Sequence, residues 1–155
     1  MEPKRPADSI TQMTEIILPS DSNALGGAFG GRVMQWIDVC GAVAAQRHCR
    51  KTVVTASMDE LHFRAPIRMG HVACLEARVN AAFSRSLEVE VVVHSENPLT
   101  GERRLCCDAF LTFAALDDDF KPTSVPPLLS ESEDEIARAD EAAKRRAKRL
   151  EGRPS

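Results

Sequence analysis

The sequence predicts one α+β domain in which a long, slim helix is wrapped by a curled antiparallel sheet of five strands, with a further helix at the C-terminus. Two patterns carry this prediction: a helical apolar stripe between Arg32 and Cys49, and a series of strand-like segments joined by short turns. With 155 residues, 43% of them hydrophobic, the chain has enough apolar side chains for one such domain and a tail.

The helix is predicted from the spacing of its apolar residues. Val33, Ile37, Cys40 and Ala44 follow the i, i+4, i+7, i+11 rule of a helix that buries one face. Gly41 lies in the same stripe among several alanines, so the helix is slim enough for a sheet to curl closely around it.

A glycine-rich loop precedes this helix. Four of the six residues from Gly26 to Gly31 are glycines, which is typical of a backbone with unusual dihedral angles or one that another group approaches closely. Before the loop, residues 10–18 form a short predicted strand that ends at Pro19.

Four further strands are predicted after the helix, from β-branched composition or from the alternation of apolar and polar residues. They are Thr52–Phe63, Val72–Phe83, Leu87–His94 and Arg103–Ala115. Short turns join the last three, which indicates an antiparallel meander. A single sheet of this kind leaves one edge and one end of the helix poorly covered, so we expect the chain to dimerise.

The remaining segments complete the predicted domain organisation. Residues 1–9 are expected to form a flexible arm, residues 10–116 the helix-and-sheet domain, residues 117–129 a linker and residues 130–155 a helical tail. The tail is acidic in its first half and basic in its second, which suits the helix dipole. Its apolar stripe is thin, so we expect a partly solvated helix docked on a neighbouring element. The stripe consists of Ile136, Ala139, Ala143, Ala147 and Leu150.

Composition argues against several classes of partner. The net charge of -3 gives no general attraction to nucleic acid or to an anionic membrane. One tryptophan and no tyrosine leave few aromatic platforms on which bases could stack. The longest apolar runs lie near Val89–Val93 and are far shorter than the roughly 20 residues that cross a bilayer. We therefore expect no nucleic-acid partner and no membrane insertion.

Cysteine usage indicates a reducing compartment. The five cysteines are odd in number, lie in apolar stretches and lack the paired spacing of a zinc site, so we expect buried reduced thiols and no metal. Lys4 and Arg5 are not followed by the apolar segment of a secretory signal. These observations predict a cytoplasmic protein.

The most informative polar residue is Asp38, next to the apolar stripe of the predicted helix. A carboxylate there is costly unless it is paired or used, although an exposed aspartate on the outer helix edge is an equally weighted interpretation. The helix starts from a loop whose free N–H groups can receive an anion. An oxyanion held at Gly30 and Gly31, with a carboxylate two turns on, is an arrangement suited to acyl transfer.

These residues also carry a resemblance to a known family. Residues 21–31, followed by Met34, Ile37, Asp38 and Gly41, resemble the active-site signature of the acyl-CoA thioesterases of the hotdog superfamily. The resemblance extends from about residue 10 to residue 128 and is strongest to the brain-type cytosolic acyl-CoA hydrolases. It includes residues 47–50, 53–59, 64–70, 84–91 and 120–122. The animal members carry two such domains in tandem, whereas this chain has one, like the bacterial members.

The resemblance implies a hotdog fold and hydrolysis of fatty acyl-CoA, with coenzyme A as part of substrate and product and no separate cofactor. It implies a site shared by two units, in which one supplies Asn23 and the other Asp38. A homodimer would then hold two complete sites, and we expect a hexamer built as a trimer of dimers. Asp38 would act as general base on water, or alternatively attack directly to give a mixed anhydride. Asn23 would orient water or substrate, and the N–H groups of Gly30 and Gly31 would stabilise the oxyanion.

Candidate contacts to the CoA phosphates lie at predicted strand ends. Arg64, Arg68 and Arg85 are placed near the expected CoA channel, with Ser84 and Ser86 beside the last of them. The competing interpretation is that these are solvated turn residues.

Two other functions compete with hydrolysis. A hotdog domain could sense acyl-CoA without hydrolysing it, but such a regulator needs a DNA-binding segment, for which residues 1–9 are too short. A hotdog dehydratase needs a histidine with an acid, and no histidine precedes His48 in the loop or helix.

Overall fold

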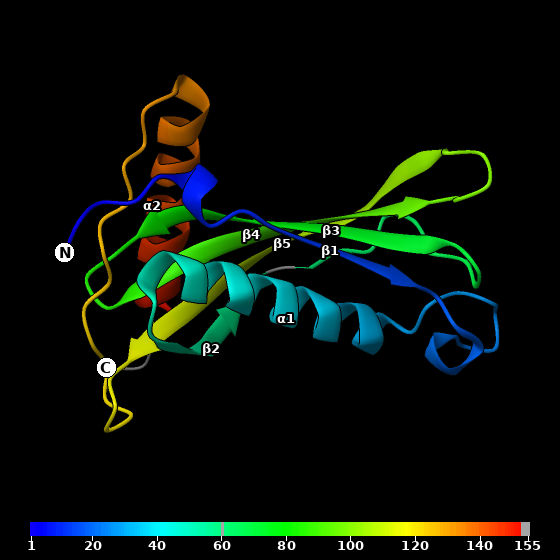
Figure 1. Cartoon of the computed structure of the whole chain (residues 1–155), viewed down its shortest axis with the longest axis horizontal. Coiled ribbons are helices and arrows are strands. Elements are labelled where there is room, and N and C mark those ends of the chain that lie inside the picture. The colour runs from blue at the N-terminus through cyan, green and yellow to red at the C-terminus, as the bar shows by residue number, and fades with distance from the viewer. Residues whose placement is uncertain (60, 153–155) are drawn as a thin grey trace.

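A computed structural model describes residues 1–59 and 61–152 of the chain (Figure 1). It contains two long helices, five strands and two short 3₁₀ helices. Their order is η1 (Pro6–Asp8), β1 (Thr11–Ile16), η2 (Pro19–Asp21), α1 (Gly30–Cys49), β2 (Thr52–Met58), β3 (Val72–Ala82), β4 (Ser86–Glu96), β5 (Arg103–Leu116) and α2 (Glu133–Glu151). None of the helices in this described part is long and apolar enough to cross a membrane.

The five strands form one sheet in the order β1-β3-β4-β5-β2, and every neighbouring pair is antiparallel. The predicted meander of the last three strands is therefore confirmed, and β1 and β2 are the edges. Figure 1 shows α1 running along one face of the sheet, while α2 lies on the other side. The predicted α+β hotdog architecture, with a long helix against a curled sheet and a C-terminal helix, is confirmed.

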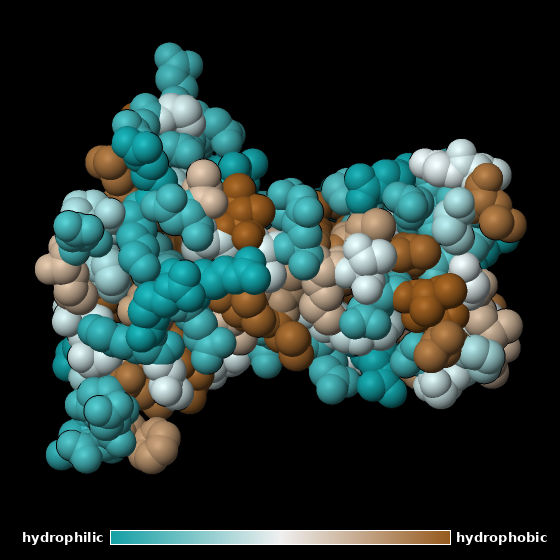
Figure 2. Space-filling view, viewed as in Figure 1, coloured by the Kyte–Doolittle hydropathy of each residue, from teal (hydrophilic) through white to brown (hydrophobic). Residues whose placement is uncertain are grey.

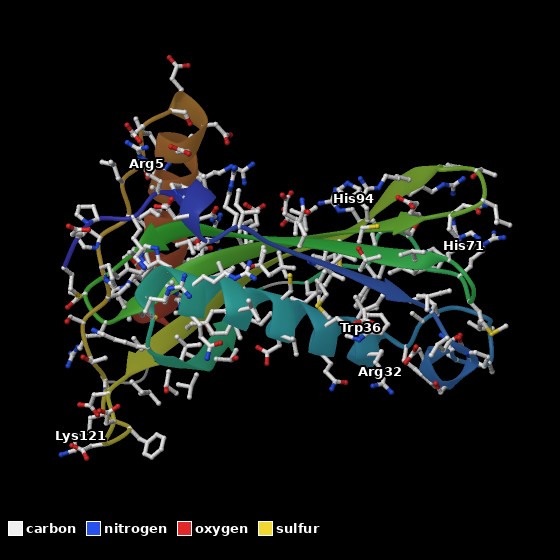
Figure 3. All side chains as sticks on the ribbon, viewed as in Figure 1. Arg5, Arg32, Trp36, His71, His94 and Lys121 are labelled. Carbon is white, nitrogen blue, oxygen red and sulfur yellow. The ribbon has the colours of Figure 1, made fainter. Side chains whose placement is uncertain are left out.

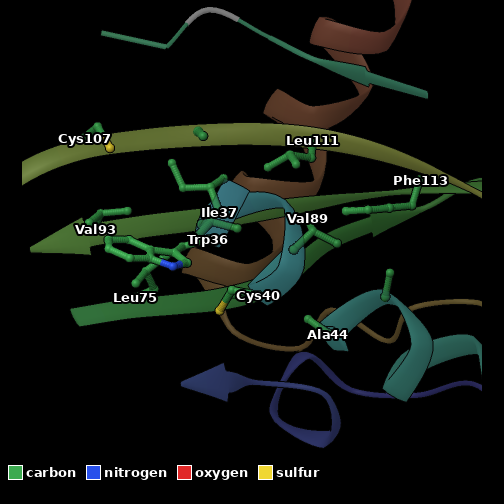
Figure 4. Close-up of a cluster of buried hydrophobic side chains, with 14 of the residues drawn as sticks. Trp36, Ile37, Cys40, Ala44, Leu75, Val89, Val93, Cys107, Leu111 and Phe113 are labelled. Carbon is green, nitrogen blue, oxygen red and sulfur yellow. The ribbon is translucent and has the colours of Figure 1, made fainter. Parts of the chain in front are cut away.

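The core lies between α1 and the sheet. Ile37, Cys40 and Ala44 face alternate residues of the strands, among them Val89 and Phe113, in one apolar cluster (Figure 4). The packing around the helix is close at Gly41, because a Cβ atom there would stand 3.2 Å from two ring carbons of Phe113. The slim helix predicted from glycine and alanine is therefore required by the curvature of the sheet.

The predicted strand Thr52–Phe63 is too long, because β2 ends at Met58 and residues 59 and 61–63 lie outside any strand; position 60 of the predicted strand lies outside the described residues. The β-branched residues that favour an extended strand stop at Thr55, and the register with β5 shifts between Thr55 and Ser57. Beyond the strand, Asp59 N still donates to Phe110 O at 2.8 Å and Arg64 N to Cys106 O at 2.7 Å, both on β5.

The terminal segments lie against the domain. In the predicted flexible arm, Pro6 and Ser9 are buried and Lys4 N donates to Pro127 O at 2.9 Å. In the predicted linker, Pro126 O accepts a bond of 2.7 Å from Nε2 of His48 at the end of α1. The prolines of this segment lack N–H groups, but their carbonyls still accept, so the two segments are held together along the end of the domain.

The tail helix docks through charged side chains. Its only buried residue in the described part of the chain is Ala142, whereas Ile136 and Leu150 of the predicted apolar stripe are 47% and 39% exposed. Arginines on the neighbouring face reach carboxylates of the sheet and of the segment after β2. The pairs are Arg138 with Glu90, Arg145 with Glu88 and Arg149 with Asp59. This partly solvated helix is therefore held mainly by ion pairs.

Candidate active site

The glycine-rich loop is folded around the side chain of Asn23. Its Oδ1 accepts hydrogen bonds from the backbone N–H groups of Leu25, at 2.9 Å, and Gly27, at 3.2 Å. Gly26, at the tip, has a φ of 80°, in the left-handed region that favours glycine. Because both bonds use the carbonyl oxygen, the Nδ2 group of Asn23 is the end of the amide that remains to donate to another molecule.

The loop is tied to the first turn of α1 by Asp21. This buried carboxylate pairs with Nε of Arg32 at 3.1 Å, and its backbone carbonyl accepts from Phe29 N at 2.8 Å. Figure 3 labels Arg32 near the start of α1, on the side of this loop. The N-cap residue Phe29 provides no side-chain cap. The N–H groups of Gly30 and Gly31 stand in the first helical turn, where an α-helix offers no carbonyl partner, so they can bind an anion.

Asp38 lies two turns further along α1 and is half-buried. Its Oδ1 accepts a hydrogen bond of 2.5 Å from Oγ1 of Thr55 on the edge strand β2. This bond holds the carboxylate in one orientation and uses one of its two oxygens. A carboxylate held in this way can accept a proton from a bound water through its other oxygen.

Thr55 was missed by the sequence reasoning. In the sequence it is one of several β-branched residues that favour a strand, and nothing local distinguishes it from its neighbours. Its role depends on β2 running beside the middle of α1, which is a long-range contact.

Within one chain the candidate groups do not converge. Asp38 and Gly30 stand about 12 Å apart along the helix axis, at 1.5 Å per residue, so one carbonyl group cannot reach both. The surroundings of Asp38 are uncovered, because the side chains of Met34, Val39 and Val54 are 42%, 47% and 45% exposed. Figure 2 shows hydrophobic residues (brown) at the surface of the face that carries α1, interspersed with hydrophilic ones. Asp38 therefore lies on a face with several exposed apolar side chains.

A small, mainly apolar pocket, here called the helix-start pocket, opens beside the first turn of α1. It has a volume of about 280 Å³, and its lining includes Gly30, Val33, Phe63, Arg64 and Cys106. A Cβ atom on Gly30 would lie 3.3 Å from the ring of Phe63, so the absence of a side chain keeps the helix N-terminus open to this pocket.

The candidate CoA contacts fall into two groups. Arg64 borders the helix-start pocket, and Arg68 pairs with Gly27 through an isolated β-bridge, so both lie near the glycine-rich loop. Ser84 and Arg85 lie in the turn between β3 and β4, and Ser86 is the first residue of β4. Ser86 pairs with Ala114, whereas Arg64 bonds to Cys106, so the two groups are separated by about 26 Å of β5 at 3.3 Å per residue. One chain does not bring them together.

Burial shifts the pKa of two other side chains, His48 and Cys40. Burial lowers the pKa of His48, which favours the neutral ring that donates to Pro126 O. Burial raises the pKa of the Cys40 thiol to about 11, which keeps it protonated and unreactive. Within the described residues, no three His, Cys, Asp or Glu side chains are grouped so that they could hold a metal ion.

Comparison with known proteins identifies the family. Residues 25–102 match the model of the thioesterase superfamily. An uncharacterized acyl-CoA thioester hydrolase of Bacillus subtilis is 42% identical over 132 residues, which cover 85% of this chain and 77% of the relative. The chain belongs to the thioesterase superfamily.

Solved structures of other thioesterases resemble the whole domain. A crystal structure of an apo-hexameric acyl-CoA thioesterase superposes with a TM-score of 0.93 at 38% identity, over 97% of each chain. An acyl-CoA hydrolase of Staphylococcus aureus, in complex with butyryl coenzyme A, coenzyme A and coenzyme A disulfide, gives a TM-score of 0.86 at 34% identity, over 96% of this chain and 93% of that one. Structures of the Staphylococcus aureus hydrolase also include variants in which an aspartate, an asparagine or a threonine is replaced by alanine.

Proposed function

We propose that this thioesterase hydrolyses fatty acyl-CoA to a free fatty acid and coenzyme A. The observation that carries the proposal is the carboxylate of Asp38, fixed by Thr55 on the helix whose N-terminal amides are open. The three residues replaced in the Staphylococcus aureus acyl-CoA hydrolase occur at the same spacing along the chain as Asn23, Asp38 and Thr55. That correspondence supports both the substrate and the choice of residues.

In the proposed reaction Asp38 is the general base. It takes a proton from a water molecule as the water oxygen attacks the thioester carbonyl carbon. The negative charge that develops on the carbonyl oxygen is stabilised by the N–H groups of Gly30 and Gly31. The C–S bond then breaks, and the CoA sulfur leaves as a thiolate or takes the proton back from Asp38. Direct attack by the carboxylate would give an anhydride intermediate instead.

Asn23 contributes its Nδ2 group. Its Oδ1 is occupied by two loop N–H groups, so it can only donate to the water or to the substrate carbonyl. Asn23→Asp is therefore a better probe than Asn23→Ala, because the aspartate retains the acceptor that folds the loop and removes the donor.

The complete site requires two chains. Asp38 is about 12 Å from the amides of its own helix N-terminus, and it is surrounded by exposed apolar residues beside the open edge of β2. A second copy placed across this face by two-fold symmetry would bring its glycine-rich loop to Asp38 and cover these residues. We propose that such dimers assemble further, as a trimer of dimers.

The same symmetry offers a role for the separated CoA candidates. Arg64 and Arg68 of one chain and residues 84–86 of another would contact a single CoA, although they lie far apart in one chain. We further propose that the enzyme works in the cytoplasm, because all five of its cysteines are free thiols.

The decisive measurement is release of free thiol from a panel of acyl-CoA substrates. Asp38→Asn should reduce turnover on the order of 10²-fold or more, as for the loss of a general base. Asp118→Asn, at an exposed position in the segment after β5, is the matched control and should keep full activity. A folded Asp38→Asn protein with wild-type turnover would exclude the mechanism, and binding without thiol release by the wild type would indicate an acyl-CoA sensor.

Mixing two inactive variants tests the shared site. Asn23→Asp and Asp38→Asn dimers each lose one partner from both sites, but a heterodimer has one site with neither change. Random exchange makes half of the dimers heterodimers, so about a quarter of wild-type activity should return. Verified heterodimers that remain inactive would show that both residues act within one chain.

A further inference from the structure

A second pocket shares the lining residue Arg64 with the helix-start pocket. It has a volume of about 580 Å³ and is enclosed by three elements: the segment after β2, the outer face of β5 and the last turns of α2. This pocket, here called the tail pocket, is large enough for a small organic ligand.

The polar groups of the tail pocket are predominantly cationic. Arg64, Arg145, Lys148 and Arg149 line it, against the carboxyl groups of Asp59 and Asp108. Arg145 and Arg149 are already engaged, with Glu88 at 2.7 Å and Asp59 at 3.1 Å.

Two cations are therefore left for a ligand. Within the part of the chain that the structure describes, Arg64 and Lys148 have no ion-pair partner, and both side chains are exposed. Burial, followed by the neighbouring Glu90, raises the pKa of Asp108 to about 7, so this carboxyl offers less negative charge near neutral pH than an ordinary aspartate. The pocket is thus suited to an anion with more than one charge.

The pocket also has a planar surface. The guanidinium of Arg145 lies 3.7 Å from the centre of the Phe110 ring, so the two side chains form a stack in the pocket wall. Aromatic rings and guanidinium planes of this kind are the groups on which nucleobases stack in proteins. Anionic groups and a planar base occur together in a phosphorylated nucleotide.

Arg64 connects the tail pocket to the proposed reaction site, because it lines both pockets. The helix-start pocket is mainly apolar and is lined by Gly30 in the first turn of α1, whereas the tail pocket is cationic. A ligand with a neutral arm at one end and a phosphorylated nucleotide at the other would suit these two pockets, with the arm in the helix-start pocket and the nucleotide in the tail pocket.

We infer that the tail pocket binds the phosphorylated adenosine end of the CoA substrate, with Lys148 of the tail helix and Arg64 contacting its phosphates. The inference rests on the proposed function and deepens it, because it makes α2 part of the substrate-binding surface. The ligand chemistry, a base with two or more phosphate charges, is shared by free nucleotides, so the test has to separate the two sources.

The test uses the full-length protein and the charge reversal Lys148→Glu, at an exposed position. Lys144→Glu is the matched control, because Lys144 lies one turn earlier on α2, is exposed and does not line the pocket. Calorimetric binding of adenosine 3′,5′-bisphosphate should weaken roughly five- to tenfold in Lys148→Glu and remain unchanged in Lys144→Glu. The KM for acyl-CoA should rise by a similar factor with kcat unchanged, whereas the KM for an acyl-pantetheine, which lacks the nucleotide, should not change.

Each outcome either supports or refutes binding of the CoA nucleotide in the tail pocket. Equal binding of the bisphosphate by wild type and Lys148→Glu, or no binding by either, would overturn the inference while leaving acyl-CoA hydrolysis by the wild type intact. Tight binding of ADP or GDP that does not compete with acyl-CoA would overturn it in favour of a free nucleotide. Lys148-dependent binding of the bisphosphate in a protein that hydrolyses no acyl-CoA would support the pocket and refute the proposed function.

Discussion

The two faces of the sheet are covered by helices that are held in opposite ways. Against α1, strand β4 presents Val89 and Val91, which are fully buried in a continuous apolar core. Against α2, the alternate residues of the same strand are Glu88 and Glu90, which are also buried but are paired with arginines. One strand therefore builds a hydrophobic contact on one side and an electrostatic one on the other.

The α1 face and the sheet therefore form the core of the fold, whereas α2 is attached to that core by ion pairs. Burial of apolar side chains is non-directional and depends little on salt or pH. A buried carboxylate is stable only while its partner is in place, because burial raises the pKa of Glu88 and the guanidinium of Arg145 opposes that rise. The α1 face should therefore resist changes of solution conditions that loosen the α2 face.

The largest effect is expected on the α1 face. Phe113→Ala removes a fully buried ring that packs on Gly41, and should lower the free energy of unfolding by about 3–5 kcal/mol. Urea denaturation followed by circular dichroism would measure it. A loss below about 1 kcal/mol would mean that the core repacks easily and that the comparison between the faces is overstated.

An intermediate effect is expected where the α2 contact is broken. Arg145→Ala leaves the Glu88 side chain, 2% exposed, without its cation and should cost about 2–3 kcal/mol. The same change should make α2 accessible to limited proteolysis while α1 stays protected.

The control is Lys144→Ala on the solvent side of α2, which should stay within about 0.5 kcal/mol of wild type. Adding Glu88→Gln to Arg145→Ala should recover part of the lost stability. If Arg145→Ala and Lys144→Ala lowered the free energy of unfolding equally, ion pairs would not be what holds α2 to the sheet.

A smaller effect, visible through pH, is expected at Asp108. Its folded-state pKa of about 7 exceeds the ordinary value because of burial first and Glu90 second, so the folded protein binds the proton more tightly than the unfolded chain. The protonated carboxyl therefore favours folding at low pH, and this contribution is lost as pH rises through 7. Asp108→Asn should be more stable than wild type at pH 8, by about 1–2 kcal/mol after allowance for partial solvent exposure. The difference should shrink towards pH 5, and a difference independent of pH would exclude Asp108 as its source.

Most of the fold follows from local patterns. The stripe from Val33 to Ala44 identified α1, and the alternation of the last three strands identified the meander. The contacts that dock the tail were harder to predict, because its thin apolar stripe indicates a partly solvated helix but not the side chains that hold it. The informative feature is the placement of three arginines on one helix face. Arg138 and Arg145 meet glutamates that alternate with valines in β4, and Arg149 meets Asp59. Sequence alone does not show that those glutamates are buried, since acidic residues alternating with valine are also typical of a solvent-facing strand.

The candidate site was predictable where chemistry and local structure coincide. Asp38 is marked by its position beside an apolar stripe, and Asn23 by the glycines that follow it. Thr55 and the tail pocket depend on contacts between segments far apart in the sequence, 17 positions for Thr55 with Asp38 and 90 for Arg149 with Asp59. No local pattern records contacts of that kind.

The close approach of Gly41 to the ring of Phe113 also constrains how this protein can diverge. A Cβ atom at position 41 would meet the ring at 3.2 Å, so the two positions cannot change freely one at a time. A larger residue at 41 would require the ring to move by a few tenths of an ångström, or a smaller residue at 113, which would create a cavity in the core. Because either change disturbs the packing of the core, we expect related sequences to keep the glycine and the phenylalanine or to replace them together.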